Sequence, residues 1–412
     1  MSVRHDIGLA EALDLVRAHL APLPGVAVPV EDAGGLVLAA DAVARVDSPS
    51  LTSSLKDGWA VRSADVASAS PEAPVRLCVA GLAVAGGPVS PTLEPGTAVQ
   101  VMTGAPLPPG ADAVLASEFA HRDGDDVLAL RDARPGRNVM PRGANVAAGS
   151  ALARAGELLT PPMTGLLAAA GLQRVVAHPR PRVAIVATGD EVVAPGTPLA
   201  PGQLYASNLV TLRSWLRHFG IEASWALARD DAEALRGAVA SVAAQVDVLL
   251  TSGGAWKSER DLTPRALADM GVRLVFHRVR LGPGKAVAFG VGDGLVAFCL
   301  PGGPASNEMA FLQVALPGLL LLSGRPTLAF PRTRAVVEQP VERWGGDPTW
   351  TEIAHARLRR RDDGELVAEV VQSPSRLHAQ AIADALVIIP EGRQRLEAGE
   401  RAEVQVLGPA PG

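Results

Sequence analysis

The hydrophobic positions of the first 20 residues repeat with the period of a helix. Leu9, Leu13, Val16 and Leu20 fall on one face, so we expect an amphipathic helix over residues 6–20. After about residue 26 the pattern changes to short β-like runs between Gly and Pro turns, which predicts a β-rich region with little helix. These runs are Val75–Val79, Thr97–Met102, Ala113–Ser117 and Val127–Leu130.

Strands and helices begin to alternate near residue 180. A short helix over Met163–Ala170, opened by Pro161, closes the β-rich region. The alternation that follows predicts a parallel sheet in a doubly wound α/β domain, covered on both faces. We expect strands at Val183–Ala187, Ala223–Ala228, Val246–Thr251 and Leu295–Leu300, and helices at Asn208–Phe219, Asp231–Ala244 and about 305–322.

The last part of the chain returns to strand-like runs separated by polar turns, which predicts a small C-terminal β-barrel or sandwich. The runs are Thr333–Glu338, Thr351–Leu358, Leu366–Val371, Ala385–Ile389 and Ala402–Leu407. We therefore expect an α/β and β multidomain fold. Its expected parts are a β-rich N-terminal and linker region (1–176) with an inserted subdomain at about 47–143, an α/β domain (177–325) and a C-terminal β-barrel (326–412).

Composition and charge exclude several classes of protein. A chain that is 48% apolar and 20% charged has the balance of a globular protein, and a net charge of -5 gives no reason to expect a nucleic-acid partner. Acidic residues interrupt the N-terminal apolar pattern, which excludes a signal peptide, and the longest apolar stretch is too short and too broken to span a bilayer. Cys78 and Cys299 alone make no disulfide framework. We expect a cytoplasmic protein without membrane or nucleic-acid partners.

Three expected strands of the α/β domain run directly into Gly-rich polar turns. The turns are 188–191 (T-G-D-E), 251–254 (T-S-G-G) and 301–304 (P-G-G-P). Ligands of such sheets bind at the carboxyl ends of the strands, where glycines let the backbone approach an anion and free amides hold phosphate. A single turn of this kind only reverses the chain in most proteins. Three at one sheet edge predict a phosphate-bearing ligand.

Acidic residues gather at the same expected edge. Carboxylates beside phosphates indicate Mg²⁺, which takes oxygens from both. The alternative is helix capping, which would suit Asp231 or Asp230, and also Asp261. The acids are Asp190, Glu191, Asp230, Asp231 and Asp261.

Lysine is rare in this arginine-rich chain. The only three lysines are Lys56, Lys257 and Lys285, and each lies in a motif of small residues. A lysine kept in such a motif suits a site that needs a compact ammonium where a planar guanidinium does not fit. Chance survival is the alternative explanation.

These turns follow one another in an order that resembles the MoeA family of molybdopterin molybdenumtransferases and the C-terminal part of gephyrin. The matching motifs are T-G-D-E at 188–191, P-G-Q-L-Y-A-S-N at 201–208, S-G-G at 252–254 followed by Asp261, P-G-K at 283–285 and L-P-G-x-P at 300–304. The similarity extends to S-L-K-D-G-W-A at 54–60, M-T-G-A-P-L-P at 102–108, Arg142-Gly143 and the C-terminal barrel, and so covers nearly the whole chain.

The resemblance implies a fold, a reaction and partners. The family has four domains and forms a homodimer, in which the α/β domain of one subunit and the N-terminal region of the other enclose the site. The implied reaction inserts molybdate into adenylylated molybdopterin with Mg²⁺ and releases AMP. A molybdopterin adenylyltransferase or an apo-molybdoenzyme are the protein partners that it suggests.

Matched position by position, the resemblance also implies roles for single residues. The implied catalytic residues are Asp57, Glu191, Asp230 and Asp261, of which the last three would also bind the metal. The implied substrate-binding residues are Thr103, Thr188, Gly189, Asp190, Ser207, Asn208, Ser252, Gly253, Gly254, Lys257, Arg278, Lys285, Pro301, Gly302, Pro304 and Ser306.

Four positions in these turns depart from the family pattern. Asn145 replaces an acid, Trp256 a serine, Gly282 a lysine and Gly303 an asparagine. Two functions therefore stay open: a Mg²⁺-dependent molybdenumtransferase, and a weakly active or inactive relative that carries molybdopterin or finished cofactor. An adenylyltransferase is a third alternative, against which the multidomain layout argues. The sequence does not distinguish molybdate from tungstate.

Overall fold

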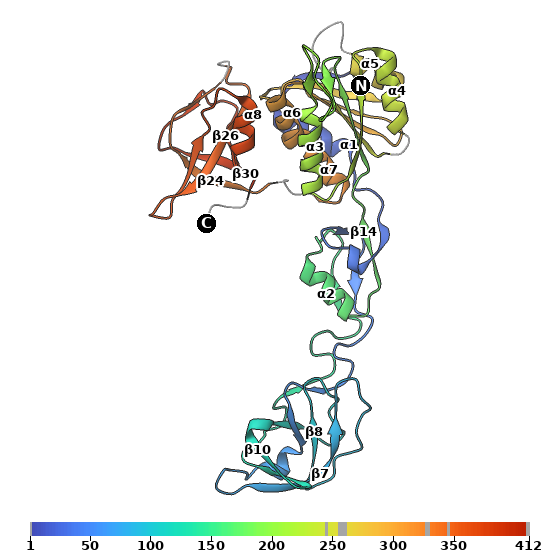
Figure 1. Cartoon of the computed structure of the whole chain (residues 1–412), viewed down its shortest axis with the longest axis vertical. Helices are drawn as coiled ribbons and strands as arrows, with labels where there is room; N and C mark the ends of the chain where they lie inside the picture. Colours follow the sequence, from blue (N-terminus) through green and yellow to red (C-terminus); the bar gives the residue numbers. More distant parts are fainter. Residues whose placement is uncertain (1, 244–245, 254–261, 326–329, 344–346, 409–412) are drawn as a thin grey trace. The chain divides into compact units, whose positions relative to one another are not determined.

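The computed structural model describes residues 2–243, 246–253, 262–325, 330–343 and 347–408. The chain forms two compact units. One unit joins Met1–Pro24 to His178–Gly412, and the other is Gly25–Ala177. Figure 1 shows both units coloured along the chain.

A seven-stranded sheet forms the centre of the first unit, in the order β1-β20-β22-β23-β19-β15-β18. The prediction of a parallel sheet holds for β18, β15, β19 and β23, but β22 runs antiparallel to both of its neighbours. The connection from β20 to β22 contains no helix, so the chain cannot cross over and return parallel. The strands are β1 (Arg4–Ile7), β15 (Val183–Thr188), β18 (Ala223–Ala228), β19 (Val248–Ser252), β20 (Arg273–Val279), β22 (Ala288–Val291) and β23 (Val296–Leu300).

Alternate residues of each central strand pack on opposite faces of this sheet. Val183 and Ile185 belong to one apolar core, whereas Ala184 and Val186 belong to another. Because both faces are covered by helices, the strands read as continuous apolar runs. The larger core also holds the first expected helix, α1. The first face carries α1 (Leu9–His19), α3 (Ser207–His218), α6 (Pro304–Ala310) and α7 (Leu316–Leu322), and the second carries α4 (Ala232–Ala243) and α5 (Leu262–Asp269).

Helix α6 continues through a π-helical turn at Phe311–Ala315 into α7, which confirms the long helix expected near 305–322. Pro317 has no N–H to donate to Gln313, and the helix widens just before it. The run Pro304–Leu322 is the one described helix long and apolar enough to cross a membrane, but 78% of its apolar window is buried inside the protein. It is therefore a core helix of the α/β sheet.

The C-terminal part of the first unit is a closed five-stranded barrel. Its strands pair in the order β26-β27-β24-β30-β28, and β28 pairs again with β26. A short strand of the α/β part, β21 (Leu281–Gly282), adds to β26 in parallel. The barrel strands are β24 (Arg332–Val337), β26 (Thr351–Arg360), β27 (Leu366–Val370), β28 (Ala385–Ile389) and β30 (Arg401–Val406), with helix α8 (Arg376–Ile382) between β27 and β28.

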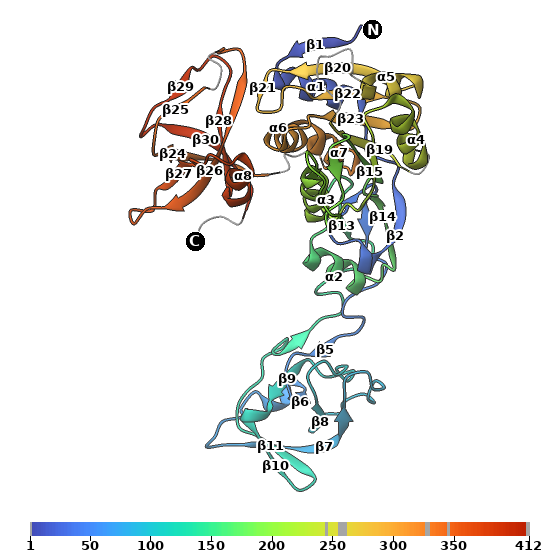
Figure 2. The ribbon, with the colours of Figure 1, turned by 45° about the horizontal axis from the view of Figure 1, so that its top comes forward.

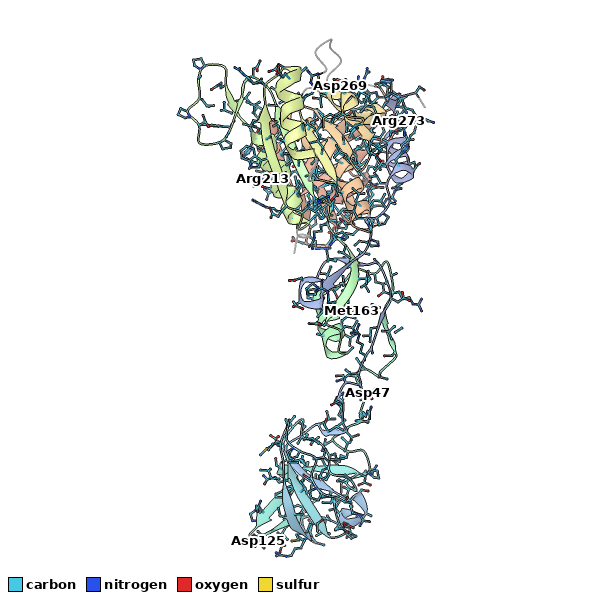
Figure 3. All side chains as sticks on the ribbon, turned by 90° about the vertical axis from the view of Figure 1, so that its right-hand side faces the viewer. Asp47, Asp125, Met163, Arg213, Asp269 and Arg273 are labelled. Atoms are coloured by element: carbon cyan, nitrogen blue, oxygen red, sulfur yellow. The ribbon has the colours of Figure 1, made fainter. Side chains whose placement is uncertain are left out.

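The second unit confirms the β-rich prediction. A six-stranded sheet β10-β11-β7-β8-β6-β9 has its own apolar core, and helix α2 (Pro161–Ala169) packs with a separate small sheet β2-β14-β3. Met163 of α2 lies against that second core (Figure 3). The strands are β2 (Val26–Pro29), β3 (Val37–Leu38), β6 (Gly58–Val61), β7 (Val75–Ala83), β8 (Thr97–Val101), β9 (Ala113–Ala116), β10 (Ala120–Asp123), β11 (Asp126–Ala129) and β14 (Arg174–His178).

The first 24 residues pack with the α/β sheet, whereas the sequence analysis grouped them with the β-rich region. Strand β1 extends the sheet by pairing with β20, and Val16 of α1 lies against Gly318 of α7. These contacts join residues about 300 positions apart in the chain, which a local pattern does not reveal.

Candidate functional site

The three Gly-rich turns meet at the carboxyl edge of the central strands. Gly253 follows β19 and has a φ of +101°, and a Cβ atom there would lie 2.7 Å from the carbonyl oxygen of Thr188 at the end of β15. The amide of Gly253 donates to the carbonyl oxygen of Leu300 at the end of β23, with a distance of 3.1 Å. Only glycine permits this packing, so the three strand ends form one continuous floor.

Two asparagines connect these turns to the helices that follow them. Asn208 Nδ2, in the first turn of α3, donates to Ser252 Oγ at 3.2 Å and to the carbonyl oxygen of Gly302 at 2.7 Å. Asn307 Nδ2, in α6, donates to the same Ser252 Oγ at 3.0 Å and to the carbonyl oxygen of Pro301 at 2.8 Å. Ser252 thus accepts hydrogen bonds from both helices.

Asn307 was not among the residues expected at the site. The residue is only 1% exposed, and it stands with Glu308 as a polar pair in a helix whose other buried residues are apolar. That pair was the available signal. Ser207 begins α3, and Pro304 and Ser306 lie in the first turn of α6, so these expected binding residues border the same floor.

Three carboxylates crowd the end of β15. The amide of Asp230 donates to Asp190 Oδ1 at 3.3 Å. Partial burial of its own carboxyl group raises the pKa of Asp230, the negative charges of Glu191 and Asp190 raise it further, and the Thr188 hydroxyl lowers it. Arg229 Nε lies 4.0 Å from Asp190 Oδ1, but both side chains are largely exposed, so the cluster keeps a negative charge that suits a cation.

Asp231 serves a different purpose. Its Oδ1 accepts from the backbone amide of Ala234 at 2.7 Å, so it caps α4 as one of the two aspartates was expected to do. Within the described ranges, no group of three or more His, Cys, Asp or Glu side chains is arranged to hold a metal ion. The expected residues Gly254, Lys257 and Asp261 lie outside the described residues.

The turn that carries Lys285 lies at the same sheet edge, because Ala288 at the start of β22 pairs with Cys299 near the end of β23. Lys285 Nζ lies 4.8 Å from the centre of the Trp350 ring, which belongs to the C-terminal part of the unit. The Arg278 guanidinium instead forms an ion pair with Asp6, with 2.7 Å between Nη2 and Oδ1. The two expected cations therefore have different surroundings.

Three family models match successive stretches of the chain. Residues 7–171 match the model of the MoeA N-terminal region (domain I and II), residues 184–320 a probable molybdopterin binding domain, and residues 342–407 the MoeA C-terminal region (domain IV). The chain is 32% identical over 385 residues to molybdopterin molybdenumtransferase 2 of Mycobacterium tuberculosis, covering 92% of this chain and 94% of that protein. The chain belongs to the MoeA family. MoeA proteins act in molybdenum cofactor biosynthesis as molybdopterin molybdenumtransferases.

Two further relatives support membership of the MoeA family. The molybdopterin molybdenumtransferase of Synechococcus elongatus is 32% identical over 410 residues, which are 97% of this chain and all of that protein. A solved molybdopterin biosynthesis MoeA protein from Pyrococcus horikosii superposes with a TM-score of 0.81 at 32% identity, covering 98% of this chain and 99% of the other. The likeness includes the fold of every part.

Two MoeA motifs far apart in the chain meet in the second unit. Asp57 Oδ1 accepts from the backbone amide of Thr103 at 2.6 Å and from its hydroxyl at 2.9 Å. The bond from the backbone amide has the larger effect and the bond from the hydroxyl the smaller, and together they hold the pKa of Asp57 below its usual range. This exposed carboxylate is therefore ionised at neutral pH. Asp57 precedes β6 and Thr103 follows β8, two neighbouring antiparallel strands.

The described positions that depart from the MoeA pattern lie in three different surroundings. Among the described residues, none would lie within 4 Å of a Cβ atom on Gly303. A Cβ atom on Gly282 would lie 3.5 Å from the carboxyl carbon of Glu352. Asn145 belongs to the second unit, where Nδ2 lies 3.9 Å from Met140 Sδ. Trp256, the fourth such position, is outside the described residues.

Proposed function

We propose that this MoeA protein inserts molybdate into adenylylated molybdopterin with the help of Mg²⁺ and releases AMP. The observation that carries the proposal is the floor formed by the three Gly-rich turns, with the crowded carboxylates of Asp190, Glu191 and Asp230 at one end. A ligand that combines phosphates and a metal oxyanion needs amide donors, a cation and acids near one another. The turns after the strands supply the acids, and Lys285 supplies the cation.

The described acids fit Mg²⁺ in charge and in donor type. Asp230 has a raised pKa because its carboxylate is partly desolvated beside those of Glu191 and Asp190, and a bound cation would relieve that repulsion. Glu191 and Asp230, with Asp261 as the third expected ligand, would hold the ion. A bound Mg²⁺ neutralises charge as the phosphoanhydride of the adenylylated substrate breaks.

Asp57 and Thr103 supply a second functional group in the proposal. The carboxylate stays ionised and is fixed by two hydrogen bonds from Thr103. In the homodimer that we propose, the group of one subunit serves the floor of the other. Mixing subunits with Asp57→Asn and subunits with Asp230→Asn tests this. Each mixed dimer would hold one intact site of two, and half of the dimers in a statistical mixture are mixed, so the mixture should regain about a quarter of the unmodified activity. Sites within a single subunit would regain none.

Release of AMP from adenylylated molybdopterin by the purified protein tests the proposed reaction. We expect release only when molybdate and Mg²⁺ are both present. Asp230→Asn should abolish it, and Asp231→Asn is the matched control, since Asp231 caps α4 through Ala234. Release that needs neither ion, or that survives Asp230→Asn, would contradict the proposal.

The missing side chain at Gly303 favours a second candidate function. Where the family pattern has an asparagine, this chain offers no side chain to the ligand. A carrier that holds molybdopterin or finished cofactor for a partner, in the cytoplasm, needs the floor without the reaction. Tight binding of adenylylated molybdopterin without AMP release would identify this function, and Gly303→Asn would then be expected to restore part of the activity.

A further inference from the structure

Glu308 is a buried carboxylate at the contact between α6 and the C-terminal barrel. Its side chain accepts hydrogen bonds from α3 and α8 and lies beside β26; these elements are labelled in Figure 2. Trp215 Nε1, in α3, donates to Oε1 at 2.8 Å, and Gln380 Nε2, in α8, donates to Oε2 at 2.9 Å. His355 Nε2, in β26, lies 3.5 Å from the same Oε2. One carboxylate therefore links two helices of the α/β part to two elements of the barrel.

The carboxylate is ionised although it is only 6% exposed. Burial alone would raise the pKa of Glu308, but contacts from His355, Trp215 and Gln380 outweigh burial and lower it. An ion in a protein core is costly unless every acceptor is satisfied. An apolar side chain would fill this place between helices with less cost, so packing alone does not explain a glutamate here.

The two helices that Glu308 joins are the ones that hold the floor of the site. Asn307, the preceding residue, donates to Ser252 and Pro301 from α6. Asn208, two helical turns before Trp215 on α3, donates to Ser252 and Gly302. Because both asparagines share Ser252, a change in the spacing of α3 and α6 would change both turns.

The barrel also holds the turn of Lys285. Strand β21 ends directly before Pro283 and pairs with β26 of the barrel. Gly284, with a φ of +126°, brings this turn against α6, where a Cβ atom would lie 3.3 Å from the amide nitrogen of Ala310. The barrel is thus connected to the turn of Lys285 through β21 and to the turn at Pro301 through Glu308 and Asn307 of α6.

We propose that the C-terminal barrel sets the geometry of the ligand-binding floor through Glu308, which acts as a positioning residue. The carboxylate fixes α6 against α3 and the barrel, and Asn307 and Asn208 pass this geometry to the turns at Ser252 and Gly302. The inference rests on the proposed function only in naming the ligand of the floor. Glu308 itself does not touch that ligand.

Three variants of the full-length chain test this role. Glu308→Gln removes the negative charge and, with its oxygen still accepting from Trp215, places an amide donor against the Gln380 donor. Glu308→Gln combined with Gln380→Glu restores the pairing, because the new amide accepts from Trp215 and donates to the new carboxylate. Gln405→Leu is the matched control. It removes a buried bond, Gln313 Nε2 to Gln405 Oε1 at 2.7 Å, between the same helical run and the same barrel but beyond α6.

Two readouts separate positioning from stability. Calorimetry with adenylylated molybdopterin should give a Kd about tenfold weaker for Glu308→Gln and within about threefold of the unmodified protein for the exchanged pair. Hydrogen exchange of the ligand-free proteins should rise in residues 301–308 and 206–209 only in Glu308→Gln. Gln405→Leu should lower the Tm and leave the Kd and those segments unchanged. If the exchanged pair does not fold, Trp215→Phe takes its place as a test. This variant removes one donor to Glu308, so it should weaken binding and raise exchange in the same direction as Glu308→Gln.

Equal Kd values and equal exchange in Glu308→Gln and the unmodified protein would overturn the inference. The inference would also be overturned if Gln405→Leu and Glu308→Gln weakened ligand binding equally, because the cause would then be general destabilisation of the fold. If the unmodified protein does not bind adenylylated molybdopterin, the proposed function fails. The exchange rates of residues 301–308 would still decide the role of Glu308.

Discussion

The carboxylate of Asp57 accepts two hydrogen bonds from one residue, Thr103, through the backbone amide at 2.6 Å and the hydroxyl at 2.9 Å. The two residues are 46 positions apart and belong to separate sequence motifs, which the pairing of β6 with β8 brings together. Both bonds stabilise the ionised form, so the orientation and the charge of Asp57 have the same cause.

Thr103→Val should therefore loosen the orientation of the Asp57 carboxylate and make its ionised form less stable. The variant keeps the backbone bond but loses the hydroxyl bond, so the pKa of Asp57 rises toward its ordinary value of 3.8 and the acid limb of the pH–activity profile moves to higher pH. We expect kcat/KM to fall about tenfold, the size of effect expected for one lost hydrogen bond to a charged group. Thr103→Ser keeps the hydroxyl and should retain the activity. An unchanged acid limb in the valine variant would exclude this role for the hydroxyl.

Asp230 and Asp231 should give opposite effects on stability and function. The pKa of Asp230 is raised above its ordinary value of 3.8, so ionising this carboxyl group in the folded protein costs stability. The cost is complete at pH values above the raised pKa. Asp230→Asn should therefore leave the ligand-free protein equally or slightly more stable at neutral pH, while AMP release is lost. Asp231→Ala should cost about 1 kcal/mol of stability through the lost cap, with activity retained.

Binding of Mg²⁺ should also depend on pH through Asp230. A proton must leave the carboxyl before a cation can bind, so affinity should rise with pH across the raised pKa and then level off. Calorimetry with Mg²⁺ alone over a pH series that begins at the ordinary value of 3.8 measures this, and proton release should accompany binding at the acid end. Loss of the pH dependence in Asp230→Asn would assign it to this residue, and its persistence would assign it elsewhere.

Trp350 should help to hold Lys285 in place. The ammonium lies 4.8 Å from the ring centre, a contact worth about 0.5–1 kcal/mol at a partly exposed site. Trp350→Leu should raise the KM for molybdate about three- to fivefold with little change in kcat. Trp350→Phe keeps an aromatic face and should stay near the unmodified value. If the leucine and phenylalanine variants behave alike, the ring face makes no contribution.

Glu308 should make the stability of the first unit depend on acid pH. Its folded pKa is below the ordinary value of 4.5, so its contribution is complete above that pH and is lost as the pH falls through the lower, folded value. Glu308→Gln should cost about 2 kcal/mol at pH 7, since hydrogen bonds to a buried charge are lost. His355 is the one titratable group among its described partners. Thermal unfolding between pH 7 and pH 3.5 should show the difference between the two proteins narrowing at the acid end.

Much of the fold was readable from local pattern. The turns at Gly189, Gly253 and Gly302 were expected to meet because parallel strands end at one edge, and they do. Helix α8 was missed because it is seven residues long and only Ser375, which caps it through the amide of His378, marks its start. Strands β20 and β22 were not predicted, because the segment between residues 251 and 295 was considered only for its motifs.

The contacts of Glu308 were beyond the reach of the sequence. Trp215 is 93 positions before it and Gln380 is 72 positions after it, and neither spacing belongs to a helix or a hairpin. A glutamate in an apolar helix indicates that a partner exists but not which one. The residue roles at Asp57, Glu191 and Lys285 came from resemblance, and they remain proposals for the experiments above.

Because of strand β21, the boundary between the α/β part and the barrel falls at one place along the chain and at another place in the folded structure. It precedes the α/β strand β22 in the chain, yet its partner is β26, and Arg280 beside it donates from Nε to the carbonyl oxygen of Thr349 and accepts from the amide of Thr351. A protein cut after residue 325 would leave this strand without its neighbour. Chimaeras that exchange barrels between relatives would have to transfer residues 280–285 together with the barrel, so the apparent module is built from two separate stretches of the gene.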